Sequence, residues 1–322
     1  MDSITQGVLG AAIGEAMLGK KTGSKGAITG AIIATIPDLD VILYLFYDKL
    51  EMLSIHRGFS HSITFSILGA LLIAAVLHKI TWFQNIKFKI LLLFVWLCLF
   101  THMLLDTFTA YGTQLFSPFN NERLGFDSIN IIDPVYTIPL IIGLALSIRF
   151  RKSTKKTSTF NKYGLIVSSL YLIFTLINKK EVQANISVKL SNQNINYSSL
   201  LTIPVGIANI NWYGVAKGRD SLYILKHSIL SDRENEIEAF PINEEFLNLV
   251  DTTIAKKMRW FAKGFYTVEK EKENIIIYNL QVDMRGIVKV GDKKAPTVGY
   301  FEVSNKNGTP EFSSGSVKNK DK

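Results

Sequence analysis

The stretch HRGFSHSITFSILGALLIAAVL, His56–Leu77, decides how the first half of this chain folds. Its last fifteen residues, 63–77, carry no charge. They suit a membrane helix, although about 17 to 25 residues usually span a bilayer. Its first seven residues contain two of the chain's five histidines and an arginine. Ionisable groups are costly in hydrocarbon, so we expect this polar start of a membrane helix to serve a function.

Apolar segments recur through the first 180 residues. The sequence therefore predicts an α-helical integral membrane domain of about six helices over residues 1–180. The segments cover residues 4–18, 26–47, 62–77, 88–108, 131–150 and 163–177. The first and third are short and would tilt or thin the bilayer locally. Small residues four apart in AIGEAMLG and GAITGA favour close helix packing.

Composition narrows the class of protein. The chain has 322 residues and one cysteine, Cys98, which excludes a disulfide framework. Its mean hydropathy is +0.20. Residues 1–180 hold 17 Lys and Arg against 10 Asp and Glu, whereas the remainder holds 19 against 17. The basic residues lie in short loops between apolar segments, which indicates membrane topology rather than nucleic-acid binding. The start, MDSITQ, lacks the basic region of a cleavable signal peptide.

Three loops carry most of this positive charge. Their basic residues are Lys20, Lys21 and Lys25, then Lys79, Lys87 and Lys89, then Arg149, Arg151, Lys152, Lys155, Lys156 and Lys162. In a six-helix arrangement all three loops fall on one side, which the positive-inside rule assigns to the cytoplasm. We therefore expect a multi-pass protein of the cytoplasmic (inner) membrane, with everything after residue 180 extracytoplasmic.

Residues 181–308 differ in character and predict a small soluble α+β domain. Short segments rich in Ile, Val and Tyr predict strands at 186–190, 221–230, 274–282 and 297–303. Residues 243–264 predict one amphipathic helix that ends at Gly264. Residues 309–322 are expected to be a disordered tail.

Polar residues in the membrane domain identify a candidate site near its outer face. They are Asp38, Asp40, His56, Arg57, His61, His102 and Asp106. An ionised Asp near the middle of a membrane helix costs about 2.5 to 3.5 kcal/mol. A bound cation would neutralise the three carboxylates, and carboxylates with imidazoles are common ligands of zinc and similar divalent ions.

The spacing of these residues favours coordination of a metal. His102 and Asp106 are four apart, so one helical face presents both. Pro37 interrupts the helix where Asp38 and Asp40 follow, which frees both carboxylates to turn inward. His56 and His61 fit a loop followed by a helix, with Gly58 in the turn and Ser60 as the helix cap.

Six potential ligands exceed the four of a tetrahedral zinc site. Metal ligands are expected at Asp38, Asp40, His56, His61, His102 and Asp106. They would hold one or two divalent ions, zinc or alternatively manganese. Arg57 would bind an anionic substrate through its guanidinium, and Asp40 is a candidate general base.

Several blocks resemble the LexA-regulated, inner-membrane-associated, metal-dependent hydrolase family. The blocks are DSITQGVLGAAIGEAMLG, PDLD, HRGFSHS, HMLLDTFTAYGTQLFSPF and IDPVYTIPLIIGLAL. The resemblance covers nearly all of residues 1–150 and implies a metal site at the same six ligands, with Arg57, Thr107 and Gly112 nearby. Many relatives carry a histidine where this chain has Gln6, so one ligand is either missing or replaced, for instance by Glu15, and whether Gln6 or Glu15 completes the site is left open.

The expected function is hydrolysis of an ester or phosphoester at the outer membrane face. The substrate would be a small molecule or lipid with an anionic group, and membrane lipids, not nucleic acid, are the expected partners. Two alternatives remain: an ion or proton pathway, and a metal-stabilised anchor that presents the outer domain.

Structural interpretations of the same residues also remain open. His56 and His61 would then hold an interfacial loop, and Asp38 and Asp40 would end a helix. Asp133, before Pro134, is expected to cap a helix.

Overall fold

A computed structural model describes residues 1–151, 158–231, 236–281, 288–290, 293–295, 299–306 and 309–316. The chain divides into two compact units: a helical unit of residues 1–43 and 55–176, and a sheet unit of residues 44–54 and 177–322. The division after residue 176 lies close to the expected boundary at 180. Lys152, Lys155 and Lys156, used above for orientation, lie outside the described residues.

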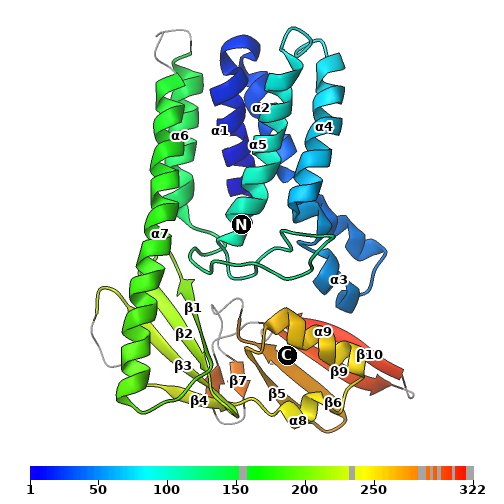
Figure 1. Cartoon of the computed structure of the whole chain (residues 1–322), viewed down its shortest axis with the longest axis vertical. Coiled ribbons are helices and arrows are strands. Elements are labelled where there is room, and N and C mark those ends of the chain that lie inside the picture. Colours follow the sequence, from blue (N-terminus) through cyan, green and yellow to red (C-terminus); the bar gives the residue numbers. More distant parts are fainter. Residues whose placement is uncertain are drawn as a thin grey trace. The chain divides into compact units, whose positions relative to one another are not determined.

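The helical unit is a bundle of helices (Figure 1). Its elements are α1 (Ser3–Thr22), α2 (Ser24–Thr35), η1 (Pro37–Leu45), η2 (Phe59–His61), α4 (Ile63–Lys79), α5 (Phe88–Thr107), α6 (Pro134–Arg149) and the first part of α7 (Ser158–Asn192). Pro37 begins a 3-10 helix, as its effect on a regular helix requires. Asp133 accepts a hydrogen bond from the Val135 amide, which confirms its role as the cap of α6.

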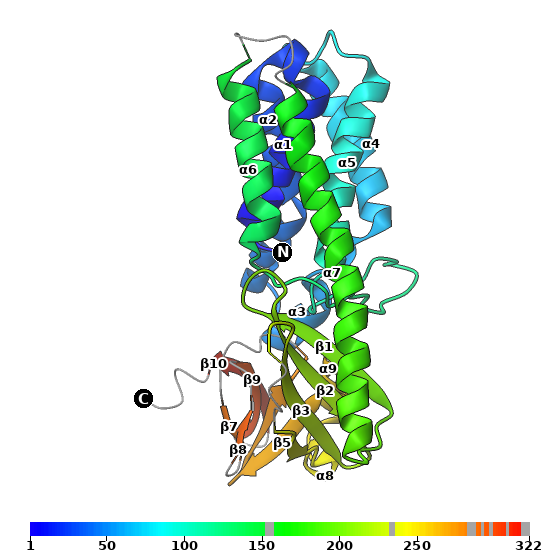
Figure 2. The same cartoon turned by 90° about the vertical axis from the view of Figure 1, so that its left-hand side faces the viewer.

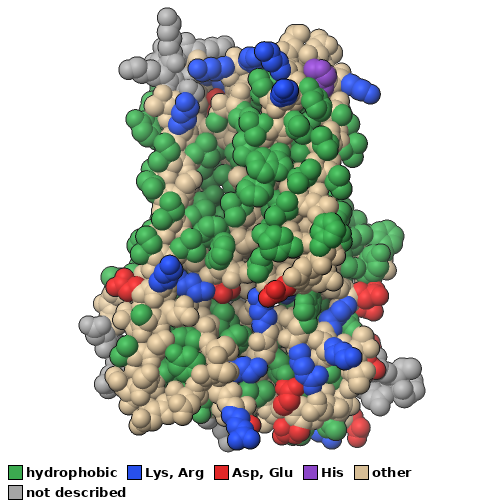
Figure 3. All heavy atoms as spheres, in the orientation of Figure 1, with side chains coloured by type: hydrophobic (Ala, Val, Ile, Leu, Met, Phe, Trp, Pro, Cys, Tyr) green, Lys and Arg blue, Asp and Glu red, His purple; other side chains and the backbone are tan. Residues whose placement is uncertain are grey.

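Two described helices are long and apolar enough to cross a membrane: α5, and residues 159–192 of α7. Two further pairs of consecutive helical segments are apolar enough together but are bent where they join: α2 with η1, and residues 49–61 with α4. If each pair forms one span, the number of candidate spans is four. The expected six crossings are not confirmed. Hydrophobic side chains cover the helical unit on the face seen in Figure 3, as a membrane-embedded surface requires.

The described parts of the three basic loops lie at one end of the helical unit. Loops α1–α2 and α4–α5, the C-terminal end of α6 and the N-terminal end of α7 share this end in both ribbon views, and Lys and Arg side chains gather there (Figures 1, 2 and 3). The N-terminus lies at the other end of the unit (Figure 1). This arrangement matches the charge asymmetry from which the topology was predicted.

Helices α1 and α2 approach closely along their glycines. A Cβ on Gly14 would lie 2.1 Å from the Gly26 carbonyl oxygen, and one on Gly10 would lie 2.2 Å from that of Gly30. Only glycine permits this approach, so the small-residue spacing serves packing, as expected.

The sheet unit contains two antiparallel four-stranded sheets, ordered β1-β2-β3-β4 and β10-β9-β6-β5, and the β7-β8 hairpin. Its strands are β1 (Ser199–Val205), β2 (Asn211–Lys217), β3 (Ser221–Ser228), β4 (Glu238–Pro241), β5 (Tyr266–Glu271), β6 (Asn274–Asn279), β7 (Val288–Val290), β8 (Lys293–Ala295), β9 (Gly299–Lys306) and β10 (Thr309–Ser316). Its helices are α3 (Lys49–Ile55, except the last residue), α8 (Glu244–Leu247), α9 (Thr252–Ala262) and the C-terminal part of α7. A sheet-rich domain therefore follows the helical region.

Three local predictions were wrong here. Residues 186–190 belong to α7, because Val182, Ile186 and Leu190 recur every four residues and pack on Trp212 of β2. The single helix over 243–264 is two helices, since Asp251 caps a new start at Thr252.

The third concerns the expected tail. Residues 309–316 form β10, paired with β9, rather than disordered chain. Residues 317–322 lie outside the described part.

Candidate metal centre

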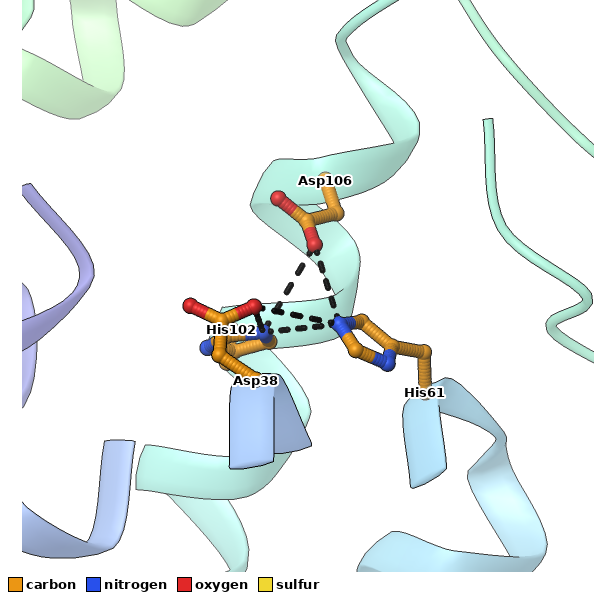
Figure 4. Close-up of side chains that lie close together, drawn as sticks. All are labelled: Asp38, His61, His102 and Asp106. Carbon is orange, nitrogen blue, oxygen red and sulfur yellow. Dashed lines mark hydrogen bonds and ion pairs between the residues drawn. The ribbon is translucent and has the colours of Figure 1, made fainter. Parts of the chain in front are cut away.

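Four of the six expected ligands converge within the helical unit. Asp38 comes from η1, His61 from η2, and His102 and Asp106 from α5 (Figure 4). One donor atom from each lies within 4.8 Å of all the others. His61, His102 and Asp106 have fully buried side chains, whereas the Asp38 side chain is 18% exposed. The group is therefore approached from the side of Asp38.

The spacing of the four donor atoms fits one small divalent ion. His61 Nε2 and His102 Nε2 are 3.2 Å apart. Each lies 3.3 to 3.5 Å from Asp106 Oδ2 and 3.5 Å from Asp38 Oδ1. A tetrahedron with zinc–ligand distances of about 2.0 to 2.1 Å has edges of roughly 3.3 to 3.4 Å. These five donor–donor distances therefore have the size expected of a tetrahedral site, and the two carboxylates each supply a donor atom within 4.8 Å of the other.

The two imidazoles are oriented so that both present lone pairs to the centre. His102 Nδ1 hydrogen-bonds the Ala34 carbonyl, which requires a proton on Nδ1. His61 Nδ1 lies 2.9 Å from Ser60 Oγ and 3.5 Å from Asp40 Oδ2. In the neutral rings each Nε2 is then an acceptor that faces another acceptor and two carboxylate oxygens. Only a cation or additional protons would relieve this repulsion.

The two oxygens of Asp106 have different surroundings. Oδ1 accepts from the Met1 amine and from Gln6 Nε2 at 3.0 Å, and Arg57 Nη2 lies 3.4 Å away. Oδ2 has no hydrogen-bond donor among the described residues and points at the two imidazole Nε2 atoms. One oxygen is thus fixed by the protein and the other is directed at the candidate centre.

Asp40 and His56 lie outside the group of four. Asp40 Oδ1 contacts His56 Nδ1 at 2.9 Å, and Oδ2 accepts from the Arg57 amide at 2.9 Å and Ser60 Oγ at 3.0 Å. Asp40 therefore lies behind His61, in the position of a carboxylate that orients a ligating histidine. The expectation that Ser60 caps α4 was wrong, because Ser62 is the cap and accepts a hydrogen bond from the Phe65 amide.

Arg57 is held next to the candidate centre. Its backbone has φ 55°, which a non-glycine residue adopts only when its surroundings impose it. Nη1 donates to Thr109 Oγ1 at 3.0 Å, whereas the buried Nε has no hydrogen-bond partner within the described chain. The guanidinium therefore offsets the charge of Asp106 and retains one donor.

Gln6 and Glu15, the two candidates to complete the site, are separated by the fold. Gln6 donates to both Asp106 Oδ1 and the His102 carbonyl, and its Oε1 has no hydrogen-bond partner in the described residues. Glu15 instead pairs with Arg151 and accepts from Ser147 Oγ at 3.1 Å. Gln6 therefore belongs to the site, and Glu15 stabilises the helix bundle elsewhere.

Thr107 and Gly112 shape the loop that follows α5. The Thr107 carbonyl accepts from the Phe126 amide, and Gly112 has φ +70°. A Cβ on Gly112 would meet the Leu124 carbonyl oxygen at 2.8 Å. The sequence did not point to Met1, Thr109 or the Ala34 carbonyl, which contact the site and carry no local signal, and it assigned Ser60 to a helix cap rather than to His61 and Asp40.

A family model supports the membrane assignment. Residues 1–182, which include every residue of the candidate centre, match the model described as "YdjM inner membrane protein". The chain belongs to the YdjM inner membrane protein family. With its apolar helices, this membership makes the chain an inner membrane protein.

One curated relative is "Uncharacterized protein YfhP" of Bacillus subtilis (strain 168). It is 33% identical over 153 residues, which cover 45% of this chain and 46% of the relative. The match thus spans about half of each protein. No solved structure matches the chain significantly.

Proposed function

We propose that this YdjM-family member is a membrane-bound, metal-dependent hydrolase of an ester or phosphoester bond. The observation that carries the proposal is the convergence of two imidazole Nε2 atoms and two carboxylate oxygens at 3.2 to 3.5 Å in a buried site. Such a donor set suits zinc, with manganese as the alternative. The described residues bring one such group together, which supports one ion.

A divalent ion in such a site would make a bound water acidic and polarise an ester oxygen. His61, His102 and Asp106 would hold it from the buried side. The partly exposed Asp38 lies on the accessible side, where water or substrate would bind as a fifth ligand or in place of this carboxylate. Catalytic zinc sites keep such an open position, whereas structural sites are closed by four protein ligands.

His56 is better placed than Asp40 to move protons. Asp40 accepts hydrogen bonds on both oxygens, so it suits holding His56 and His61 in position. The His56 side chain is 22% exposed and its Nδ1 faces Asp40. Nε2 is then the atom that would exchange a proton with substrate or water.

Arg57 supports an anionic substrate. Its Nε is the guanidinium donor without a hydrogen-bond partner in the described residues. A phosphoester or carboxylate oxygen is a suitable acceptor for it. The site lies at the end of the helical unit opposite to the basic loops, since Met1 contacts Asp106 (Figure 1). Under the positive-inside rule that end faces outward, where lipid and envelope esters are accessible.

The test is hydrolysis by the full-length protein in lipid nanodiscs, loaded with zinc or manganese. Chromogenic phosphomonoesters, phosphodiesters, carboxylic esters and short-chain phospholipids are the substrates. We expect turnover with at least one class, loss of metal and activity in Asp106→Asn, and loss of activity with metal retained in His56→Gln. Metal binding without turnover of any class would favour the structural anchor, and loss of metal in His56→Gln would refute the acid-base role.

A further inference from the structure

Two neighbouring turns of the sheet unit expose large apolar side chains. Ile207, in the β1–β2 turn, is 60% exposed; Ile229 and Leu230, after β3, are 43% and 75% exposed. The Ile229 amide donates to the Ile210 carbonyl at 3.0 Å, so the two turns lie side by side. The three side chains therefore form one apolar tip, which we call the turn tip.

The backbone of the β1–β2 turn is held in an unusual conformation. Gly206, Ala208 and Asn209 have φ of +79°, 62° and 58°. A left-handed backbone is unfavourable for alanine, so the surrounding structure must hold Ala208 in this conformation. A Cβ on Gly206 would meet nothing within 4 Å, so the turn faces open space at this residue.

A hydrogen bond from α7 holds the β1–β2 turn at a defined position along the helix. Asn178 Nδ2 donates to the Asn209 carbonyl at 2.8 Å, and Trp212 Nε1 donates to the same oxygen at 2.9 Å. Asn178 and Asn209 are 6% and 2% exposed. Ile207 lies two residues from Asn209, so their Cα atoms are at most roughly 7 Å apart.

Asn178 marks the point where α7 leaves the membrane. The helix begins at Ser158, and residues 163–177 are apolar. These fifteen apolar residues form about 22 Å of helix, shorter than the roughly 30 Å of hydrocarbon, so local thinning of the bilayer and snorkelling of the flanking Lys162 and Lys179 would accommodate the span. The next residues, Asn178, Lys179, Lys180 and Glu181, are polar. A turn bound to Asn178 is therefore at the height of the lipid headgroups.

We propose that the turn tip inserts into the lipid headgroup region of the membrane from which α7 emerges. Its Ile and Leu side chains would be buried at the boundary with the acyl chains, as amphipathic surfaces of membrane-bound proteins are. Lys179 and Lys180, at the same height, would attract anionic headgroups. The contact would fix the sheet unit against the membrane surface. It is independent of the proposed hydrolase activity.

Fluorescence quenching by lipids tests the proposal on the full-length chain. An environment-sensitive nitrobenzoxadiazole label is placed on Ile207→Cys and, separately, on Leu230→Cys, in nanodiscs that contain anionic lipid. Spin-labelled lipids quench the label from within the bilayer. Cys98 is buried, and unlabelled wild type verifies that it does not react. The matched control is Leu249→Cys, 63% exposed, which follows α8 at the opposite end of this unit from the point where α7 enters it (Figures 1 and 2).

We expect blue-shifted emission and several-fold stronger lipid quenching at positions 207 and 230 than at position 249. Equal quenching at all three positions would overturn the proposal. Blue-shifted emission without lipid quenching would also overturn it, because the tip would then be covered by protein.

Discussion

At the scale of single residues, the candidate centre depends on how each imidazole is turned. His102 is fixed by a backbone carbonyl and His61 by Ser60 and Asp40, so both direct Nε2 at the same point. Two acceptors at 3.2 Å, together with two carboxylate oxygens, are stable only with a cation or additional protons between them. The orientation of the ligands, more than their number, therefore makes this point a candidate metal position.

The variant Asp40→Asn tests whether Asp40 orients a ligating histidine or binds the metal directly. The substitution keeps the shape of Asp40 but weakens its hydrogen bonds to His56 and Ser60. We expect zinc affinity to fall about 10- to 100-fold, as for other outer-sphere carboxylates, while binding persists. Competition with a fluorescent zinc chelator measures it. Complete loss of binding would make Asp40 a direct ligand, as the sequence alone had predicted.

The site was partly predictable from the sequence at this scale. The four-residue spacing of His102 and Asp106 and the helix break at Pro37 follow local rules, and in the structure His102, Asp106 and Asp38 do lie close together. The separation of Asp40 and His56 from the group depends on the 56–62 turn, which no local rule fixes. Glu15 could not be assigned because its partner Arg151 is 136 residues away.

At the scale of elements, the helices of the first half were predictable because apolar length specifies them. Their bends were not, and the bends decide how many segments count as spans. The end of α7 was misread because ISVKL alternates like a strand over five residues, although the longer four-residue repeat is helical. Residues 309–316 were expected to be disordered because they are polar, but they form β10 through backbone pairing with β9. Composition alone does not reveal such pairing.

Gly14→Ala tests the contact between α1 and α2. Its methyl group would lie 2.1 Å from the Gly26 carbonyl oxygen, so the helices must separate. Overpacking of this kind typically costs about 1 to 3 kcal/mol. We expect a lower thermal unfolding midpoint in detergent. The control is Gly7→Ala on the same helix, whose methyl group would meet only Thr35 Cγ2 at 3.8 Å and should not lower the midpoint, because alanine favours a helix over glycine. Equal midpoints in the two variants would contradict the packing account.

At the scale of the whole molecule, the account predicts on which side of the membrane each part lies. From the charge asymmetry we predict that the basic loops are in the cytoplasm and the sheet unit is outside. An impermeant maleimide added to intact spheroplasts should label Leu249→Cys. It should label Gln84→Cys, in the basic α4–α5 loop, only after permeabilisation. The reverse pattern would invert the topology and place the candidate centre at the cytoplasmic face.

The measurement that tests the central claim most directly is metal content of the full-length protein, by elemental analysis after purification in detergent and reconstitution with zinc or manganese. We expect about one equivalent in wild type. His102→Ala and Asp106→Asn should lose it while remaining folded, and His78→Ala, an exposed histidine outside the site, should retain it. Wild type without metal after reconstitution, or equal metal content in all four proteins, would contradict the account.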